Sequence, residues 1–429
     1  MSQPSSPSQP TRRRSSMGTI ALGDNSGPAL ATMPENVQQA RASKARQRAI
    51  SNTSLDDRKA PAGTSSSAVV DQDDKPLGPL AYLWTSYREY SYQNTWLNPL
   101  LTMLVVVGAY YAQGNPGPQN PLHRFIFPSY KLAPHTELNP TDDYMYGKGK
   151  RDFTFVGFYM IFFTFFREFV MQMFLKPFAT FCGVTKKGKV NRFMEQTYSI
   201  IYYSLAGSFG LYIMYQTPIW FFNTTAFYEN FPHKTHIAMF KVYYLLQAAF
   251  WGQQSVILCM QLEKPRKDFK ELVFHHIVTI ALIWCSYRFH FTWMGLCVYV
   301  TMDVSDVFLA VSKTLNYVDH AITGPFFLVF MGVWVYTRHY LNLKILYSIL
   351  TEFATVGPFE LNWVTQQYKC TLSQRITFCL LAALQLVNAY WCFLIFRIAY
   401  RFIFHDIQKD ERSDDEDEDE DEDESKKDK

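Results

Sequence analysis

Long apolar segments alternate with short polar ones through the middle of the chain, and both ends are polar. A helix of about 20 apolar residues crosses the hydrocarbon core of a bilayer. Several of the segments contain polar residues, as helices that line an internal cavity do, and the first is short enough for an interfacial helix. The pattern predicts an all-α polytopic membrane protein. We place about eight transmembrane helices, at Trp96–Ala112, Phe153–Leu175, Tyr198–Tyr215, Ile237–Cys259, Leu272–Phe289, Met294–Ser312, Pro325–Leu346 and Thr377–Ile403.

The two ends of the chain differ from this middle part. Residues 1–80 are rich in Ser, Pro, Gln and Ala and have no apolar run of signal-peptide type, so they predict a disordered tail. Residues 406–429 hold fifteen acids and five bases, including eleven consecutive acids, and predict a solvated acidic tail. Between them we place the first two spans with their loop in residues 81–188, and a six-helix domain in residues 189–405.

The charge balance changes once the acidic tail is set aside. The chain carries a net charge of +3, and the acidic tail contributes −10 to it. The part of the chain before the tail therefore carries +13. This excess fits the positive-inside rule, anionic lipid or a phosphate-bearing substrate, and composition does not choose between them. The seven cysteines are scattered singly, mostly in apolar stretches, which argues against structural disulfides.

Basic residues in short loops predict the orientation of the spans. The densest basic loops are Lys186–Arg192 and Lys264–Lys270. Placing both in the cytosol gives an even number of spans with both termini cytosolic. The sequon at Asn223 then faces the lumen, where N-glycosylation is expected, while the loop at Lys148–Arg151 lies there against the rule. The final Lys426-Lys427-Asp428-Lys429 has the form of an endoplasmic reticulum retrieval signal, and its alternative is a solubilising charged end.

Ionisable side chains stand inside two consecutive spans. His275 and His276 begin one helix, and Asp303, Asp306 and Lys313 lie in the next. Each such group costs roughly 2.5–3.5 kcal/mol on insertion scales, so a function for the set is the preferred interpretation. A histidine oriented by a buried carboxylate is a device for general-base or nucleophilic catalysis. The alternative is that these groups only join helices by hydrogen bonds.

Helix geometry narrows the roles within this set. Adjacent residues on a helix are about 100° apart, so His275 and His276 do not point at the same place. Asp303 and Asp306, spaced by three, share a face. At ~1.5 Å per residue, His275 lies roughly 5 Å inside the cytosolic boundary, Asp306 roughly 10 Å and Asp303 roughly 15 Å. Asp306 is therefore the expected direct partner of a histidine, with Asp303 as deeper support.

Other chemistries find no matching residues. Membrane di-iron enzymes gather histidines in HxxxH and HxxHH clusters, whereas the other eight histidines here are dispersed, so we expect no metal. The chain has no Gly-x-Ser-x-Gly elbow, dinucleotide fingerprint or P-loop. Nothing in it indicates nucleic-acid binding.

Three stretches carry a family resemblance. Residues 262–317 read LEKPRKDFKELVFHHIVTIALIWCSYRFHFTWMGLCVYVTMDVSDVFLAVSKTLNY, residues 243–254 read YYLLQAAFWGQQ and residues 337–342 read TRHYLN. They resemble the ceramide synthases, fungal members above all, within the TLC (TRAM–LAG–CLN8) membrane-domain family, from about residue 189 to 405. Ala310 stands where many animal members have glutamate, a departure that bears on subtype.

The resemblance implies an enzyme of the endoplasmic reticulum membrane that joins a long-chain acyl-CoA to the amine of a sphingoid base. It implies that the last six helices form a barrel around a lipid cavity, and that His275, His276, Asp303 and Asp306 are the activity-linked residues. Very long acyl chains, a small single-span accessory subunit and a second ceramide synthase protomer or paralogue are further expectations. No cofactor is expected, since acyl-CoA is a substrate.

Several more residues are assigned to binding or modification. The phosphates of coenzyme A are expected on Lys264, Arg266 and Lys267, for which topology alone is an equal explanation. Arg338 is expected to pair with a buried acid or carbonyl, and it is kept among the candidate substrate-binding residues. Gln253, Gln254 and Tyr287 are candidates to line the cavity, and Ser15, Ser16 and Ser51 follow basic residues as phosphorylation sites do. A non-enzymatic lipid sensor or transporter is the alternative function; it has no need of the histidine and aspartate pairs.

Overall fold

The structure is a computed structural model that describes residues 79–137, 139–260 and 268–405. The predicted tails, with Ser15, Ser16, Ser51 and the dilysine end, lie outside the described residues. By packing, the described chain forms two units, one from residues 79–175 and 235–260 and the other from residues 176–234 and 268–405. This grouping places the helix at 238–260 with the first unit, although the sequence assigns it to the six-helix domain.

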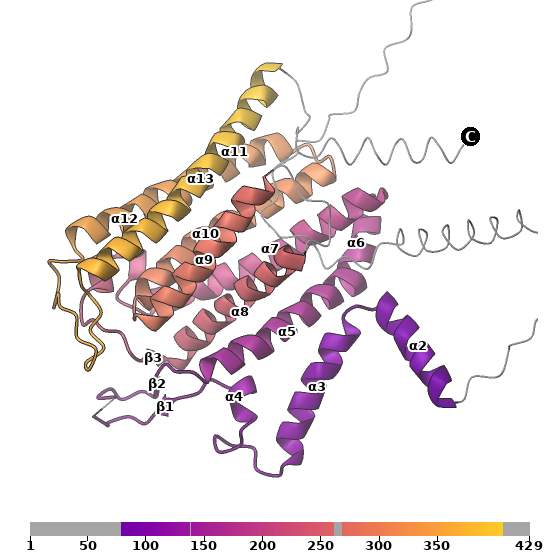
Figure 1. Cartoon of the computed structure of the whole chain (residues 1–429). Helices are drawn as coiled ribbons and strands as arrows, with labels where there is room; N and C mark the ends of the chain where they lie inside the picture. The colour runs from indigo at the N-terminus through magenta and orange to yellow at the C-terminus, as the bar shows by residue number, and fades with distance from the viewer. Residues whose placement is uncertain (1–78, 138, 261–267, 406–429) are drawn as a thin grey trace, which may run out of the picture. The chain divides into compact units, whose positions relative to one another are not determined.

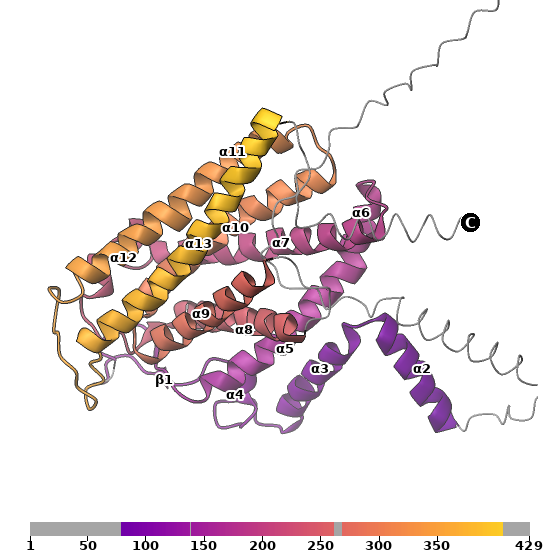
Figure 2. The ribbon, with the colours of Figure 1, turned by 45° about the horizontal axis from the view of Figure 1, so that its top comes forward.

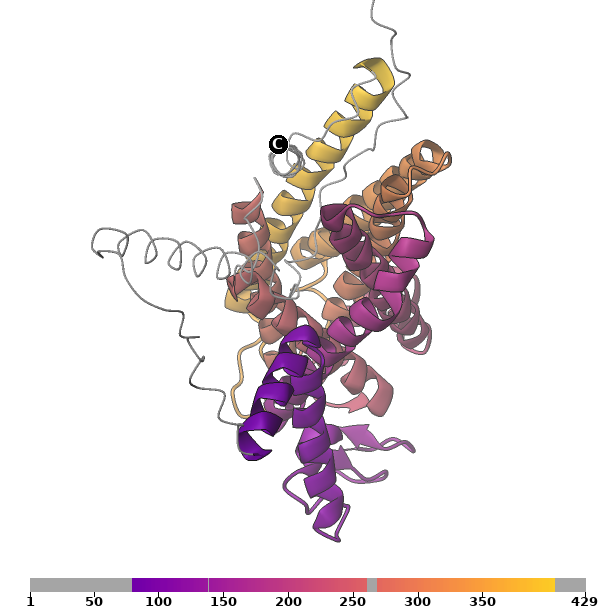
Figure 3. The same ribbon diagram turned by 90° about the vertical axis from the view of Figure 1, so that its right-hand side faces the viewer.

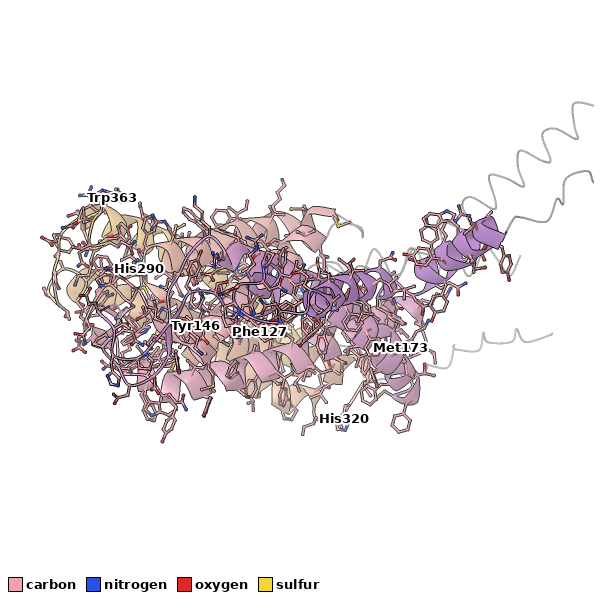
Figure 4. All side chains as sticks on the ribbon, turned by 90° about the horizontal axis from the view of Figure 1, so that it is seen from below. Phe127, Tyr146, Met173, His290, His320 and Trp363 are labelled. Atoms are coloured by element: carbon pink, nitrogen blue, oxygen red, sulfur yellow. The ribbon has the colours of Figure 1, made fainter. Side chains whose placement is uncertain are left out.

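The smaller unit is built on two packed helices. Helix α5 (Asp152–Val170) continues through the π-helix η1 (Met171–Leu175) and packs against α8 (Ala238–Met260). Its other face is covered by α3 (Leu97–Ala112) and the short α4 (His123–Ile126). Helix α2 (Pro79–Gln93) precedes α3 and is bent from it by 111° (Figure 1). In this unit the labelled Met173 of η1 lies apart from Tyr146 (Figure 4).

A three-stranded sheet and a buried lysine close one end of this unit. Strand β2 (Met145–Tyr146) pairs antiparallel with β1 (Lys131–Leu132) and with β3 (His236–Ile237). Next to the sheet, the fully buried Lys241 of α8 places its Nζ 2.8 Å from Asp152 Oδ1. The same ammonium donates to the carbonyl oxygens of Ser129 at 2.8 Å and Gly147 at 2.6 Å. It thereby joins the starts of α5 and α8 to the loops of the sheet.

Lys148, in the loop that the predicted orientation places against the positive-inside rule, interacts with Lys241 and Asp152 of this cluster. Burial lowers the pKa of its ammonium well below the usual range, and the neighbouring Lys241 lowers it further, against the opposing pull of Asp152. Desolvation by the surrounding protein is therefore the main influence on this ammonium.

The larger unit contains the helices that carry the ionisable residues. Its elements are α6 (Lys176–Phe181), α7 (Lys187–Tyr215), the 3₁₀ turns η2 (Trp220–Phe222) and η3 (Thr225–Phe227), α9 (Phe269–Arg288), α10 (Thr292–Tyr317), α11 (Thr323–Trp334), the π-helix η4 (Val335–Leu341), α12 (Asn342–Thr351) and α13 (Thr371–His405). In Figure 4 the labelled His290, before α10, and Trp363, before α13, lie toward one end of the unit and His320, after α10, toward the other. Helix α10, the continuous run from α11 through η4 to α12, and helix α13 therefore alternate in direction.

Helix α10 is the central helix of this unit. It packs against α7, α9, α11 and η4 (Figure 2). Two contacts fix the register of α10 on α7: Gly207 approaches Asp303, and Phe193 lies in a cluster with Tyr317. The second contact is fourteen residues before the first on α7 and fourteen residues after it on α10, so the two helices are antiparallel. A second apolar cluster joins α10, α11 and α13 through Leu309, Phe330 and Trp391. Helix α13 also runs beside α9 (Figure 3).

Each predicted span coincides with a helix or a continuous run of helices. Within the described residues, four helices are long and apolar enough to cross a membrane, and a fifth span results if the bent pair α2–α3 counts as one. These four are Asp152–Phe181, Phe269–Arg288, Thr292–Tyr317 and Thr371–Phe404. The chain is a mostly helical membrane protein, and the predicted count of eight spans remains a prediction.

Candidate active site

The two histidines lie in the second turn of α9, and both are buried. Their ring centroids are 5.8 Å apart and the ring planes are nearly perpendicular, at 79°. The His275 ring contacts the indole of Trp391 on α13 at 5.1 Å between centroids. Its Nε2 is also 3.5 Å from the hydroxyl of Thr279, one turn along α9. His275 is therefore placed against α13.

The carboxylates stand at the level of the histidines. His276 lies 12 residues before the end of α9 at Arg288, and Asp303 lies 11 residues after the start of α10 at Thr292. At ~1.5 Å per residue these positions are nearly level in the antiparallel pair. Asp303 is completely buried, and its Cβ would lie 3.6 Å from a Cβ added at Gly207 of α7. A glycine at that position lets the two helices approach closely.

Arg338 forms the most extensive polar contact of the site. It lies in the π-helix η4, a type of helical irregularity that often marks functional sites. Its Nε donates to Ser305 Oγ at 2.6 Å, its Nη1 donates to Asn388 Oδ1 at 3.1 Å, and its Nη2 forms an ion pair with Asp306. The guanidinium also stacks on Trp334, 4.2 Å from the ring centroid. One side chain thus joins η4, α10 and α13.

The contacts of Asp306 differ from the expectation. We predicted a histidine as its direct partner, whereas its carboxylate pairs with Arg338 in the described structure. The expected pairing of Arg338 with a buried acid is confirmed. Depth along two helices does not give the direction of a side chain, and Arg338 comes from a third helix. Lys313, two turns from Asp306 on α10 and also buried, adds a second attractive charge.

Helix α13 supplies residues that the sequence reasoning did not select. Asn388 and Trp391 are three residues apart and therefore share a face of α13. Asn388 holds Arg338, and Trp391 contacts His275, so this face links the histidine to the arginine cluster. An amide inside an apolar span is itself a signal of function or of helix contact, and it would have identified Asn388.

The remaining predicted site residues are placed less directly. Gln253 and Gln254 are buried on α8, in the other unit, where Gln254 Nε2 donates to Gln253 Oε1 at 3.1 Å. Tyr287 is half-buried near the end of α9. Lys264, Arg266 and Lys267 lie outside the described residues. Asn223 is exposed in the loop after α7, with Nδ2 3.3 Å from the Pro218 carbonyl oxygen.

Known proteins are similar to most of this chain. Residues 192–397 match the family model described as a TLC domain. The chain is 49% identical over 403 residues to "Ceramide synthase LAG1" of Saccharomyces cerevisiae, which covers 94% of this chain and 91% of that protein. The chain belongs to the ceramide synthase family.

Two further relatives span a range of identities within this family. "Sphingosine N-acyltransferase lac1" of Schizosaccharomyces pombe is 48% identical over 324 residues, 76% of this chain and 82% of that protein. "Ceramide synthase hyl-1" of Caenorhabditis elegans is 29% identical over 236 residues, 54% of this chain and 63% of that protein. The TLC-domain match contains His275, Asp306, Arg338 and Asn388, so the whole cluster lies in the part of the chain that matches the family model.

A metal site is not apparent in the residues that the structure describes, where no three His, Cys, Asp or Glu side chains are grouped to hold an ion. Imidazoles such as those on α9 and carboxylates such as those on α10 are side chains that can transfer protons and stabilise charge. A neutral imidazole accepts a proton, and buried carboxylates together with Arg338 and Lys313 fix the local charge distribution.

Proposed function

We propose that this ceramide synthase transfers a long or very long acyl chain from acyl-CoA to the amine of a sphingoid base, dihydrosphingosine or phytosphingosine, to form the corresponding ceramide. The observation that carries the proposal is the 49% identity, over 94% of the chain, to a protein named ceramide synthase. The buried histidines and aspartates on adjacent helices support it, because a lipid sensor or transporter has no need of such a set.

The reaction requires a base at the amine. A sphingoid ammonium is largely protonated near neutral pH, and it must lose a proton before or during attack on the thioester carbonyl. We assign this role to His275 rather than His276, because the His275 ring contacts the α13 face that carries Asn388. Asp303, level with the histidines, and Asp306, held by Arg338, offset the positive charge that develops on the imidazole.

A second route makes His275 a nucleophile that first accepts the acyl group and then passes it to the amine. The two routes differ when acyl-CoA is supplied alone. Mass spectrometry of the protein after incubation with acyl-CoA would detect an acyl adduct on the α9 peptide in the nucleophilic route. The general-base route gives no adduct under single-turnover conditions.

The membrane arrangement belongs to the same proposal. We propose eight spans in the endoplasmic reticulum membrane, with both termini cytosolic. We propose that basic residues receive the phosphates of coenzyme A. They are Lys186 and Lys187, which are exposed at the start of α7, and Lys264, Arg266 and Lys267, which lie outside the described residues. Basic side chains and helix starts both attract phosphate.

Partners and cofactors are proposed on the resemblance alone. They are a small single-span accessory subunit, a second ceramide synthase protomer or paralogue, and no cofactor besides the acyl-CoA substrate. The modifications rest on sequence patterns instead: basic residues precede the proposed phosphorylation sites Ser15, Ser16 and Ser51, and a sequon begins at the proposed N-glycan site Asn223.

The direct test is an acyl-transfer assay with purified protein. Sphinganine and acyl-CoAs of increasing chain length are incubated with the parent protein and with His275→Ala, His276→Ala and Asp306→Ala, and amide product is measured by mass spectrometry. His320→Ala, an exposed histidine at the turn after α10, is the matched control. We expect product with the parent and the control, and a loss of product with His275→Ala. Absence of amide from the parent at every chain length would reject the proposed activity and favour a non-enzymatic role.

A further inference from the structure

Buried nitrogen–hydrogen donors lie against Arg338 and His275. Trp391 is 4% exposed, Asn388 0% and Trp334 1%. Trp391 Nε1, Asn388 Nδ2 and Trp334 Nε1 have no hydrogen-bond acceptor among the residues that the structure describes. Leaving one buried donor unpaired costs about 1–3 kcal/mol, so three together indicate a ligand that supplies the acceptor.

The donors nearest the histidine come from one face of α13. Trp391 and Asn388 are three residues apart, so their Cβ atoms lie about 5–6 Å from each other. The indole of Trp391, which carries Nε1, is the ring whose centroid is 5.1 Å from that of His275. Asn388 is held from its other side, because its Oδ1 accepts from Arg338 at 3.1 Å. This bond orients the amide and directs its Nδ2 away from Arg338.

The character of this set identifies the chemical group that it fits. An indole N–H and an amide N–H only donate, and Arg338 adds positive charge behind them. An acceptor without a partner on α13, Gln385 Oε1, is six residues from Trp391, whereas the two donors are three residues apart. A hydroxyl group both donates and accepts, whereas a carbonyl oxygen only accepts, and this oxygen gains negative charge during acyl transfer.

We propose that Asn388 and Trp391 form the oxyanion site of the acyl transfer, donating to the carbonyl oxygen of the fatty acyl thioester. This inference rests on the proposed function. The amine nitrogen bonds to the carbonyl carbon, and the carbonyl π electrons move to the oxygen that the two N–H groups hold. When the C=O bond re-forms, the C–S bond breaks. The amine proton passes to His275 and then to the departing thiolate, so the products are the amide and free coenzyme A.

The test is Trp391→Phe in the full-length protein, assayed with sphinganine and acyl-CoA. Phenylalanine keeps an aromatic ring against His275 and removes only the N–H. We expect kcat to fall by on the order of 10²-fold, as for loss of one oxyanion donor. The KM for sphinganine and the melting temperature of the purified protein should stay at the parent values. Trp284→Phe, at an exposed position of α9, is the matched control and should retain the parent kcat.

Asn388→Asp is the second variant. It keeps an oxygen for Arg338 and removes the Nδ2 donor, so we expect it also to lower kcat without a change in the KM for sphinganine. A parent kcat in Trp391→Phe and Asn388→Asp would overturn the proposal. So would a raised KM for sphinganine in either variant, because that result places a hydroxyl of the base at these donors. Failure of the parent itself to form amide would instead reject the proposed function.

Discussion

Removal of Arg338 is the sharpest test of how the site is held together. The guanidinium is 2% exposed and joins Asp306, Ser305 and Asn388 through three hydrogen bonds. In Arg338→Gln the Asp306 carboxylate stays buried without its counter-ion. Loss of one partner from a buried ion pair costs about 3–5 kcal/mol, most of which comes from the charge left behind. The unfolding free energy of Arg338→Gln should fall by this amount.

Two companion variants separate the charge from the hydrogen bonds. Asp306→Asn combined with Arg338→Gln leaves no lone charge, so the double variant should be more stable than Arg338→Gln alone. Arg338→Lys keeps the charge, but an ammonium does not reproduce the planar fork that reaches Ser305, Asn388 and Asp306 together, so partial destabilisation is expected. Arg375→Gln, at an exposed position of α13, is the control and should stay within about 0.5 kcal/mol of the parent.

The assay is unfolding in mixed micelles of dodecyl maltoside and sodium dodecyl sulfate. Circular dichroism monitors the helical content as the mole fraction of dodecyl sulfate is increased. A shift of the midpoint to lower mole fraction is expected for Arg338→Gln, with partial recovery in the double variant. The reasoning is refuted if Arg338→Gln unfolds at the parent midpoint, or if the double variant is no more stable than the single one.

Three more predictions concern other parts of the chain. Burial lowers the pKa of the His123 imidazole from its usual value of 6.5, so the unfolded chain binds more protons than the folded one as the pH drops, and the folded state should lose stability. His123→Gln should therefore weaken the dependence of the melting temperature on pH between pH 5 and 7, and an unchanged dependence would contradict this. A Cβ at Gly207 would lie 3.6 Å from Asp303 Cβ, so Gly207→Ala should keep the parent unfolding midpoint while Gly207→Leu loses about 1–3 kcal/mol in the same micelle titration. Asn223→Gln should abolish a mobility shift on endoglycosidase treatment of protein expressed in yeast, whereas Thr224→Ala, which keeps the sequon, should retain it; absence of any shift in the parent would refute glycosylation.

The sequence by itself determined the helical membrane class and the residues of the central pair of helices. Hydrophobic segments long enough to cross a bilayer are local properties of the chain, and charges inside them are costly enough to stand out. For this reason the local sequence is sufficient to single out His275 and Asp306. Their relative depth did not follow from the sequence, which placed Asp303 and Asp306 deeper than His275, whereas the helix bounds put Asp303 nearly level with His276 across a three-residue turn.

Tertiary structure alone decided which side chains meet. Asp306 pairs with Arg338 rather than with a histidine, because η4, which begins 29 residues after Asp306, delivers a guanidinium. Asn388 and Trp391 join the site from α13, more than eighty residues beyond Asp306 in the chain. Periodicity states which residues share a face of one helix, but not which helix lies against that face. That choice depends on the packing of all the helices together.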